Sequence, residues 1–149
     1  MSDARDSPGE LKARALRYLA RREHSRDELA RKLAPRAASP EILEGLLLEL
    51  ESKRQLSNER FAEVRAHWMS RKYGAAKIRQ DLKAKGVAED IVARVSGEGE
   101  LERALMILKR KYREPATTRE ERARRARFLQ GRGFSYDTIR RAISGTEAE

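Results

Sequence analysis

Apolar residues recur at every fourth position along most of this chain. The pairs and triplets with this spacing are Leu29/Leu33, Ile42/Leu46/Leu50, Ile78/Leu82, Ile91/Val95, Leu101/Leu105 and Ile139/Ile143. Residues four apart lie on one face of an α-helix, whereas a half-buried strand alternates every two residues, and no segment sustains that alternation. The hydrophobic pattern therefore predicts an all-α protein.

Capping residues divide this pattern into separate helices. Ser25 and Thr118 are each followed three residues later by a glutamate, which is the spacing of a capping box. Further helix starts are expected at Ser39 with Pro40, at Ser57 and at Ser135, and a helix end is expected at Gly86. The predicted helices are residues 9–23, 25–34, 39–53, 57–73, 74–85, 87–95, 98–113, 118–132 and 135–144.

One longer pattern occurs three times. The copies are Leu19-x-x-Arg22-x-x-Ser25-x-x-x-Leu29-x-x-x-Leu33, Trp68-x-x-Arg71-x-x-Gly74-x-x-x-Ile78-x-x-x-Leu82 and Leu129-x-x-Arg132-x-x-Ser135-x-x-x-Ile139-x-x-x-Ile143. A repeat of this length is typical of stacked supersecondary units, which build long surfaces more often than deep catalytic pockets. We therefore expect an elongated array of tandem three-helix repeats, and a function in binding.

The expected domains follow from this repeat. They are a disordered N-terminus at 1–8, three helical repeats at 9–53, 54–96 and 97–144, and a frayed C-terminus at 145–149. The third repeat ends without a closing helix after residue 144. Either that helix is missing or residues 98–113 take its place.

Composition narrows the class of protein. The 149 residues are 39% apolar and 39% charged, which suits a thin core with a wide polar surface. No cysteine is present, so disulfides and thiolate metal sites are excluded. No apolar run approaches a membrane span, and residues 1–9 lack the apolar core of a signal peptide. We expect a soluble cytoplasmic protein that does not associate with membranes.

The net charge of +10 favours an acidic partner. Basic stretches at 10–36, 71–85, 103–113 and 119–141 alternate with acidic stretches at 41–63 and 89–102. The basic helices either form one stripe or are ordinary solvated faces with pairs four residues apart. The candidate partner- or DNA-binding residues are Arg26, Arg31, Lys32, Arg71, Lys72, Lys77, Arg79, Lys83, Lys85, Arg122, Arg124, Arg125, Arg127, Arg132, Arg140 and Arg141. Such a surface suits phosphates or an acidic protein groove, and the sequence leaves both open.

The sequence contains few residues that would indicate a catalytic site. His24 and His67 are the only histidines, and no phosphate-binding glycine loop occurs. Acid pairs such as Glu89-Asp90 fall in first helix turns, where they complement the helix dipole. We expect no enzyme activity, no catalytic residue, no cofactor and no metal site.

The aromatic residues of the repeat are interpreted as packing residues. Trp68 shares its column with two leucines, so we expect it in the core rather than on a base-stacking surface. His67 is expected to be partly buried, and His24, Tyr73 and Phe134 to staple consecutive helices together. With the aromatics in the core, single-strand recognition by stacking is disfavoured.

The arginine of the repeat has two interpretations. Arg22, Arg71 and Arg132 each follow a helix and could bind its last carbonyls and offset its dipole. They could also point outward to phosphates or carboxylates. We favour the structural role.

Several segments resemble the RecX regulatory family. They are Ala15-Leu-Arg-Tyr-Leu-Ala-Arg-Arg-Glu-His-Ser-Arg-Asp-Glu-Leu-Ala-Arg-Lys-Leu33, Ser57-Asn-Glu-Arg-Phe-Ala62, Arg71-Lys-Tyr-Gly-Ala-Ala-Lys-Ile-Arg-Gln-Asp-Leu-Lys-Ala-Lys-Gly-Val87, Lys109-Arg-Lys-Tyr112 and Arg127-Phe-Leu-Gln-Gly-Arg-Gly-Phe-Ser-Tyr-Asp-Thr-Ile139. They extend over about residues 11–144 in the family's order. The resemblance implies a curved array of tandem three-helix repeats without a catalytic site.

The resemblance also implies a partner. Family members bind the RecA recombinase and its filament on single-stranded DNA, and lie along the filament groove. They suppress strand exchange, ATP hydrolysis and co-protease activity, and so modulate DNA repair and the SOS response. We expect a monomer with this role, and direct contact with DNA stays open. The alternative is a general nucleic-acid-binding protein that acts without RecA.

Overall fold

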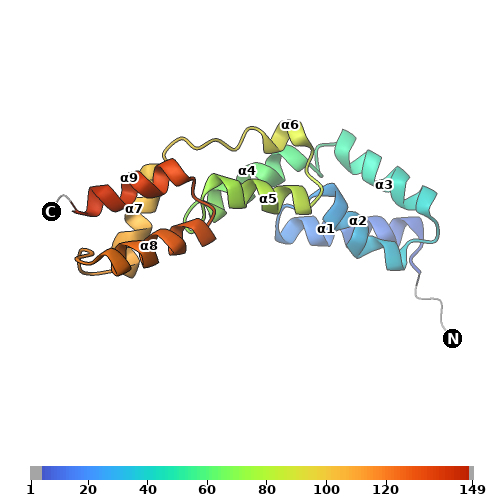
Figure 1. Ribbon diagram of the computed structural model, residues 1–149. Helices are drawn as coiled ribbons and strands as arrows, with labels where there is room; N and C mark the ends of the chain where they lie inside the picture. Colours follow the sequence, from blue (N-terminus) through green and yellow to red (C-terminus); the bar gives the residue numbers. More distant parts are fainter. Residues whose placement is uncertain (1–4, 148–149) are drawn as a thin grey trace. The chain divides into compact units, whose positions relative to one another are not determined.

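The computed structural model describes residues 5–147, and this part of the chain is helical without strands (Figure 1). Its helices are α1 (Pro8–Arg21), α2 (Arg26–Leu33), the 3₁₀-helix η1 (Ala34–Arg36), α3 (Pro40–Ser52), α4 (Asn58–Met69), α5 (Ala75–Ala84), α6 (Glu89–Val92), α7 (Glu100–Lys111), α8 (Arg119–Gly131) and α9 (Tyr136–Glu147). The predicted all-α class and the nine α-helices of this part are confirmed. The helix expected at 87–95 is the exception in length, because α6 is a single turn.

The capping residues act largely as expected. Ser25 Oγ accepts from the Glu28 amide at 3.1 Å, and Glu28 accepts in return from the Ser25 amide. Thr118 Oγ1 caps α8 by accepting from the Glu121 amide. The Glu121 carboxylate, however, accepts from the amide of Thr117 and not from that of Thr118. Residues 39, 57 and 135 each accept from the amide three residues on. The expected boundaries therefore rest on real hydrogen bonds.

The chain ends differ from expectation. Residues 1–4 and 148–149 lie outside the described part, so their predicted disorder stays a prediction. Ser7 and Glu10 form a capping box that starts α1 at Pro8, and Asp6 accepts from Arg14 Nε at 2.7 Å. Helix α9 continues beyond residue 144. The described residues near both ends are thus more ordered than the sequence pattern indicates.

The chain forms two compact units. The N-terminal unit runs up to Val64 and includes Lys83–Ile91. The C-terminal unit consists of Arg65–Leu82 and the chain from Val92 onward. Helices α4, α5 and α6 contribute residues to both units.

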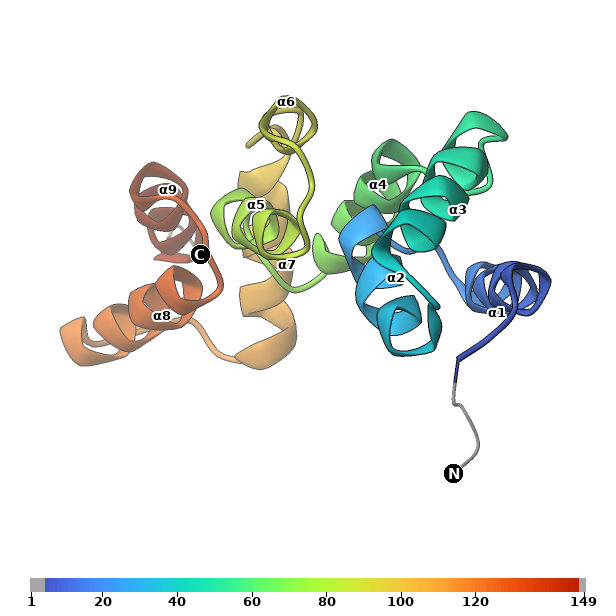
Figure 2. The same cartoon turned by 90° about the vertical axis from the view of Figure 1, so that its right-hand side faces the viewer.

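Three adjacent helices, α1, α2 and α3, carry the core of the N-terminal unit (Figure 2). The buried residues are Leu11, Ala15, Leu29, Leu33, Leu47, Leu50 and Leu56. The predicted apolar pairs Leu29/Leu33 and Leu46/Leu50 point into or against this cluster. The four-residue spacing therefore identified the core-facing side of α2 and α3.

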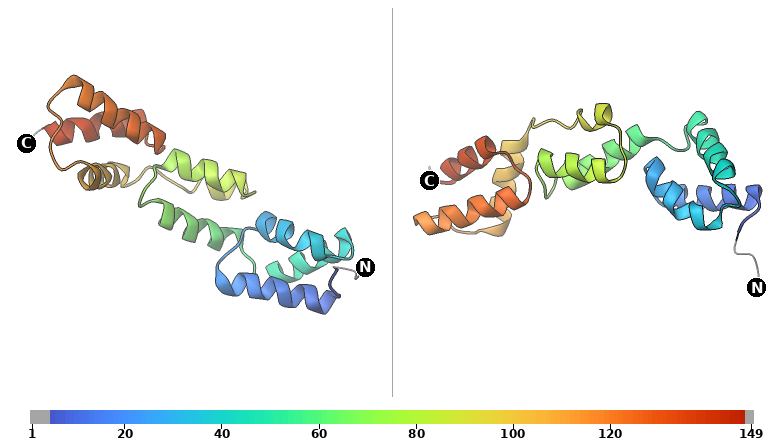
Figure 3. Two further views of the ribbon diagram at one scale, coloured as in Figure 1. Left: turned by 90° about the horizontal axis from the view of Figure 1, so that it is seen from below. Right: turned by 45° about the vertical axis from the view of Figure 1, so that its right-hand side comes forward.

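Helix α7 takes the place of the missing closing helix in the third repeat. It packs on α9, which also packs on α8. In the left view of Figure 3, α7 is seen nearly end on, while α8 and α9 are seen from the side. The shared core is Ala104, Ile107, Leu108, Leu129, Phe134, Ile139 and Ala142. The third sequence copy therefore lies on the last two helices of its repeat, whereas the first two copies lie on α1–α2 and α4–α5.

Gly74 stands where the other two copies have serine because it lies directly against the backbone of the α8–α9 turn. Its amide donates to the Arg132 carbonyl at 2.8 Å. A Cβ atom at this position would lie 2.5 Å from the Gly133 carbonyl oxygen and 2.6 Å from the Phe134 nitrogen. The contact excludes any side chain at Gly74 and so also excludes a serine cap for α5.

A glutamate from the next repeat caps α5 instead. Glu100 is buried, and one carboxylate oxygen accepts from the Ala75 amide at 3.0 Å. The other oxygen accepts from Thr138 Oγ1, near the start of α9, at 3.1 Å. In the N-terminal unit, Asn58 Oδ1 accepts from the Arg26 amide at 2.8 Å in the same manner. In both units, the first residue of one repeat's first helix caps the second helix of the repeat before it.

Replacing Gly74 by serine is expected to destabilise the protein by about 1–3 kcal/mol, because the new Cβ atom must displace a backbone segment. The free energy of unfolding, measured by urea titration with circular dichroism, tests this expectation. Gly45→Ala is the matched control, since Gly45 lies within α3 with open space around it. That substitution should stabilise the helix by about 0.5–1 kcal/mol. Equal stability of Gly74→Ser and the parent chain would contradict the contact.

His24 is buried between α1 and α2 and is held in its neutral form. Its Nδ1 lies 3.0 Å from the Arg22 carbonyl, and its Nε2 lies 2.8 Å from Lys32 Nζ. The carbonyl requires a proton on Nδ1, so Nε2 accepts from the ammonium group. Burial lowers the pKa of His24, and the nearby charges of Arg22 and Lys32 lower it further.

This histidine should make stability depend on pH. The pKa of His24 is lower in the folded chain than its ordinary value of 6.5, so the unfolded chain binds the proton more strongly. The contribution of His24 to the free energy of unfolding is expected to be constant at pH values above the ordinary pKa of 6.5 and to decline as pH falls below 6.5. His24→Gln should remove this slope between about pH 5.5 and 7.5, whereas His67→Gln, at an exposed position, should keep it. A slope that survives in His24→Gln would assign the effect to another group.

Candidate functional site

Most cations of the N-terminal unit are paired with carboxylates of the same unit. The pairs are Lys12–Glu49, Arg14–Asp6, Arg22–Glu28, Arg26–Glu44, Arg26–Glu51, Arg36–Asp6, Lys53–Glu49, Arg60–Glu23 and Lys83–Glu89. The hydrogen bond to Glu49 raises the pKa of Lys12, and those to Glu51 and Glu44 raise the pKa of Arg26. These side chains are committed to intramolecular contacts and are poor candidates for binding a partner.

The binding residues predicted in this unit therefore differ in whether another group of the chain already holds them. Arg26 and Lys83 are paired, as described above. Lys32 is exposed, but its ammonium group bonds His24 and lies 4.9 Å from the centre of the Tyr18 ring. Arg31 is exposed on α2, and Lys85 is half-buried.

In the C-terminal unit, by contrast, several cations gather around the Gly74–Gly133 contact. Arg71, Lys72, Lys77 and Arg132 lie on the two turns that meet there and on the start of α5, and we call them the junction cluster. Arg132 Nη1 donates to the Lys72 carbonyl at 3.3 Å. The Lys77 Cβ and backbone lie against Gly133. The tight backbone contact thus gathers four cations from two repeats into one place.

None of the four forms an ion pair with a side chain of residues 5–145. The side chains of Arg71, Lys72 and Lys77 are exposed, and Arg132 is half-buried. A group of cations without nearby counter-charges creates a positive potential that attracts phosphates or carboxylates. The junction cluster is therefore the part of the predicted site that the fold brings together.

Aromatic rings extend this cluster along α8. The Arg132 guanidinium lies 4.9 Å from the centre of the Phe128 ring and 5.4 Å from that of Tyr73. Lys111 Nζ lies 4.7 Å from the Phe128 ring centre, and Phe128 meets Tyr112 edge to face at 6.3 Å. Cations above ring faces are held in place without being neutralised, so they stay available to an anionic partner.

Other predicted site residues serve the fold instead. Arg125 is 7% exposed and donates to the Glu114 carbonyl at 2.7 Å, so the exposed position expected for it is wrong. Arg79 donates to the Val95 carbonyl at 2.6 Å. Both Arg140 and Arg141 pair with the carboxylate three and four residues earlier. Arg124 and Arg127 are exposed on α8, and Arg122 is half-buried.

The prediction for Trp68 is also wrong. It is 55% exposed, and the Arg65 guanidinium lies 5.3 Å from its ring centre. Asp81 holds that arginine through two hydrogen bonds of 3.0 and 3.2 Å. His67 is exposed as well. The reason is the phase of α4, whose buried face carries Phe61 and Met69, eight residues apart, so position 69 replaces position 68 in the core.

The repeated arginines do not bind the last carbonyls of the helices they follow. Arg22 bonds the Glu28 carboxylate and the Glu23 carbonyl, which lies beyond α1. Arg132 bonds a carbonyl of the neighbouring repeat. Two of the three thus have a structural role, but through other partners than expected. Arg71 is exposed in the junction cluster.

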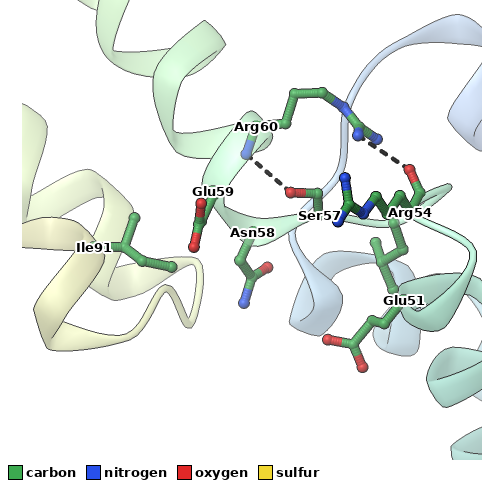
Figure 4. A pocket seen from close by; sticks show the side chains of 8 residues that line it. Glu51, Arg54, Ser57, Asn58, Glu59, Arg60 and Ile91 are labelled. Carbon is green, nitrogen blue, oxygen red and sulfur yellow. Dashed lines mark hydrogen bonds between the residues drawn. The ribbon is translucent and has the colours of Figure 1, made fainter.

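The N-terminal unit also carries an open pocket of about 650 Å³ next to the start of α4 (Figure 4). Its wall combines Arg54 and Arg60 with Glu51 and Glu59. Arg60 donates to the Arg54 carbonyl at 3.0 Å. Charges of both signs line this pocket, so it does not select an anion or a cation. Across residues 5–147, no group of three or more histidine, aspartate or glutamate residues could hold a metal ion.

No helix in the described part of the chain combines the length and apolarity needed to cross a bilayer.

Protein-family models match nearly the whole chain in three consecutive parts. Residues 12–50 match the first three-helix domain of RecX, residues 57–95 the second, and residues 98–143 the third. The tandem three-helix organisation is thereby shown. The wider domain limits expected from the sequence stay a prediction.

Individual relatives agree with the family models. The regulatory protein RecX of Herbaspirillum seropedicae is 47% identical over 139 residues, covering 91% of this chain and 90% of the relative. The RecX protein of Neisseria meningitidis is 38% identical over 135 residues, covering 89% and 88%. The crystal structure of RecX from Lactobacillus salivarius has the same fold, with a TM-score of 0.81 and 19% identity over 95% of this chain and 97% of that one. The chain belongs to the RecX family, a family of regulatory proteins rather than enzymes.

Proposed function

We propose that this protein binds RecA and the RecA filament on single-stranded DNA, and that it lies along the filament groove. In this position it inhibits strand exchange, ATP hydrolysis and co-protease activity, and thereby modulates DNA repair and the SOS response. It acts as a monomer in the cytoplasm, without catalytic activity. The observation that carries the proposal is the junction cluster, within a chain of the RecX family.

Charge explains why this cluster suits such a partner. A filament of protein on DNA presents carboxylates and phosphates close together, and both attract lysine and arginine. Binding would break no ion pair of Lys72 or Lys77, because neither forms one among the side chains of residues 5–145. Each phosphate contact would also release counterions, so affinity should fall as salt rises. The rigid glycine contact beneath the cluster keeps the cost of ordering the backbone low.

The purified protein is expected to slow the single-strand-dependent ATP hydrolysis of RecA at substoichiometric ratios, because one bound molecule would block several filament subunits. A coupled ATPase assay over a wide concentration range measures this effect. Unchanged hydrolysis at every ratio would rule out inhibition by filament occupation.

Reversing the charge of Lys72 and Lys77 to glutamate is expected to weaken association with RecA filaments by about tenfold or more. Co-sedimentation with preassembled filaments measures the bound fraction. The double variant Arg17→Glu with Arg21→Glu is the matched control, since both arginines are exposed on α1 in the N-terminal unit. Equal loss in both double variants would mean that net charge, rather than the junction cluster, determines binding.

A general nucleic-acid-binding protein acting without RecA is the second candidate. The cations Arg132 and Lys111, held beside the Phe128 ring, favour it, because a row of positive charges binds nucleic-acid phosphates with little sequence preference. Fluorescence anisotropy with labelled single-stranded DNA at physiological salt distinguishes the two functions. Tight binding to DNA alone, without any gain when RecA is added, would support this second function.

A further inference from the structure

A second pocket, of about 490 Å³, lies in the C-terminal unit beside the last turn of α7. Leu105, Leu108 and Tyr112 form an apolar floor, and the cations Lys109 and Arg113 stand at the same wall. Lys109 and Arg113 are exposed, and neither forms an ion pair with any side chain of residues 5–145. Glu114 also lines the pocket, which therefore combines an apolar surface with three cations, Lys109, Arg113 and Arg125, and one carboxylate.

Arg125 also lines this pocket, and it is the buried cation that the proposed function leaves unused. It is 7% exposed, and its Nη2 atom donates to the Glu114 carbonyl at 2.7 Å. Its guanidinium lies 4.3 Å from the centre of the Tyr112 ring. A guanidinium has five N–H donors, and this one has a single carbonyl acceptor and no ion pair among the described residues.

The acids near Arg125 do not neutralise it through a direct contact. Glu121, one turn earlier on α8, accepts from the Thr117 amide at 2.8 Å. That hydrogen bond is the main reason why the pKa of Glu121 is lowered. Glu114 is exposed and meets Arg125 through its backbone carbonyl. The charge of Arg125 also lowers the pKa of Glu121, but no carboxylate bonds the guanidinium directly. Its remaining N–H donors are therefore left for an external anion.

We propose that this pocket binds an acidic peptide segment of a partner protein. A glutamate or aspartate of the segment would bond Arg125, and an adjacent apolar side chain would pack on the half-buried Leu105 and Tyr112. Lys109 and Arg113 would attract further carboxylates of the segment. An apolar floor disfavours a nucleic-acid strand, since phosphates would have to lie against the leucines without hydrogen bonds. This site contains none of the four cations of the junction cluster, and it does not depend on the identity of the RecA partner.

The probe is a fluorescein-labelled peptide with one phenylalanine and one leucine between two pairs of glutamates. Fluorescence anisotropy with the full chain should give saturable binding at about 0.1 M salt. Replacing the four glutamates by glutamine, or the apolar pair by serine, should each weaken the affinity by about tenfold. An unlabelled single-stranded oligonucleotide should not displace the peptide.

Arg125→Gln should weaken peptide binding by about tenfold, because it removes the buried cation. Since this variant could also lower stability, its circular dichroism melt is recorded, and Lys109→Glu provides an independent test at an exposed rim position. Lys109→Glu should weaken binding several-fold without changing the melt. The matched control is Arg17→Glu, which lies on α1 in the other unit and should leave the affinity unchanged.

Three results would overturn the proposal. They are absence of saturable binding, equal binding of the peptide without its apolar pair, and equal effects of Lys109→Glu and Arg17→Glu. The assay contains no RecA, so its outcome is independent of the ATPase and co-sedimentation experiments.

Discussion

The C-terminal unit depends on one backbone contact, in which the α4–α5 turn lies against the α8–α9 turn at Gly74 and Gly133. No side chain fits between these turns, so the start of α5 cannot carry its own serine cap. The Glu100 carboxylate supplies the missing acceptor and also bonds Thr138. One buried side chain from α7 therefore fixes the starts of two helices, where a negative charge also complements both helix dipoles. The second and third repeats are joined through this carboxylate.

The same contact determines where free positive charge gathers. In the N-terminal unit, acidic α3 residues such as Glu44, Glu49 and Glu51 pair with cations of α1 and α2. In the C-terminal unit, α7 directs Glu100 to the Ala75 amide and the Thr138 hydroxyl rather than to cations. Arg71, Lys72 and Lys77 are left without carboxylates within the described residues. The proposed binding role thus follows from how the acids are used, and not from the number of cations.

Much of the fold could be predicted from local rules. Caps such as Ser25 and Ser39 and the four-residue spacing of leucines located the helices within a few residues, because both signals act within a single helix. The candidate site was less predictable. Arg26, Arg79 and Arg125 looked equivalent to Lys72 in the sequence, but their partners come from distant segments. Trp68 was misplaced because alignment with leucines in the other copies ignored the phase set by Phe61 and Met69 on the same helix.

The sequence by itself determined the all-α class, the tandem repeat and the excess of positive charge. These properties depend on residue spacing and composition, which need no knowledge of distant contacts. Only the tertiary structure decided that α7 completes the third repeat, that Gly74 requires Glu100 as a cap, and which cations remain unpaired. Each of these depends on groups far apart in the chain meeting within hydrogen-bond or van der Waals distance. A cation that folding places beside a carboxylate or carbonyl stabilises the fold, whereas a cation without such a neighbour is available to bind a partner.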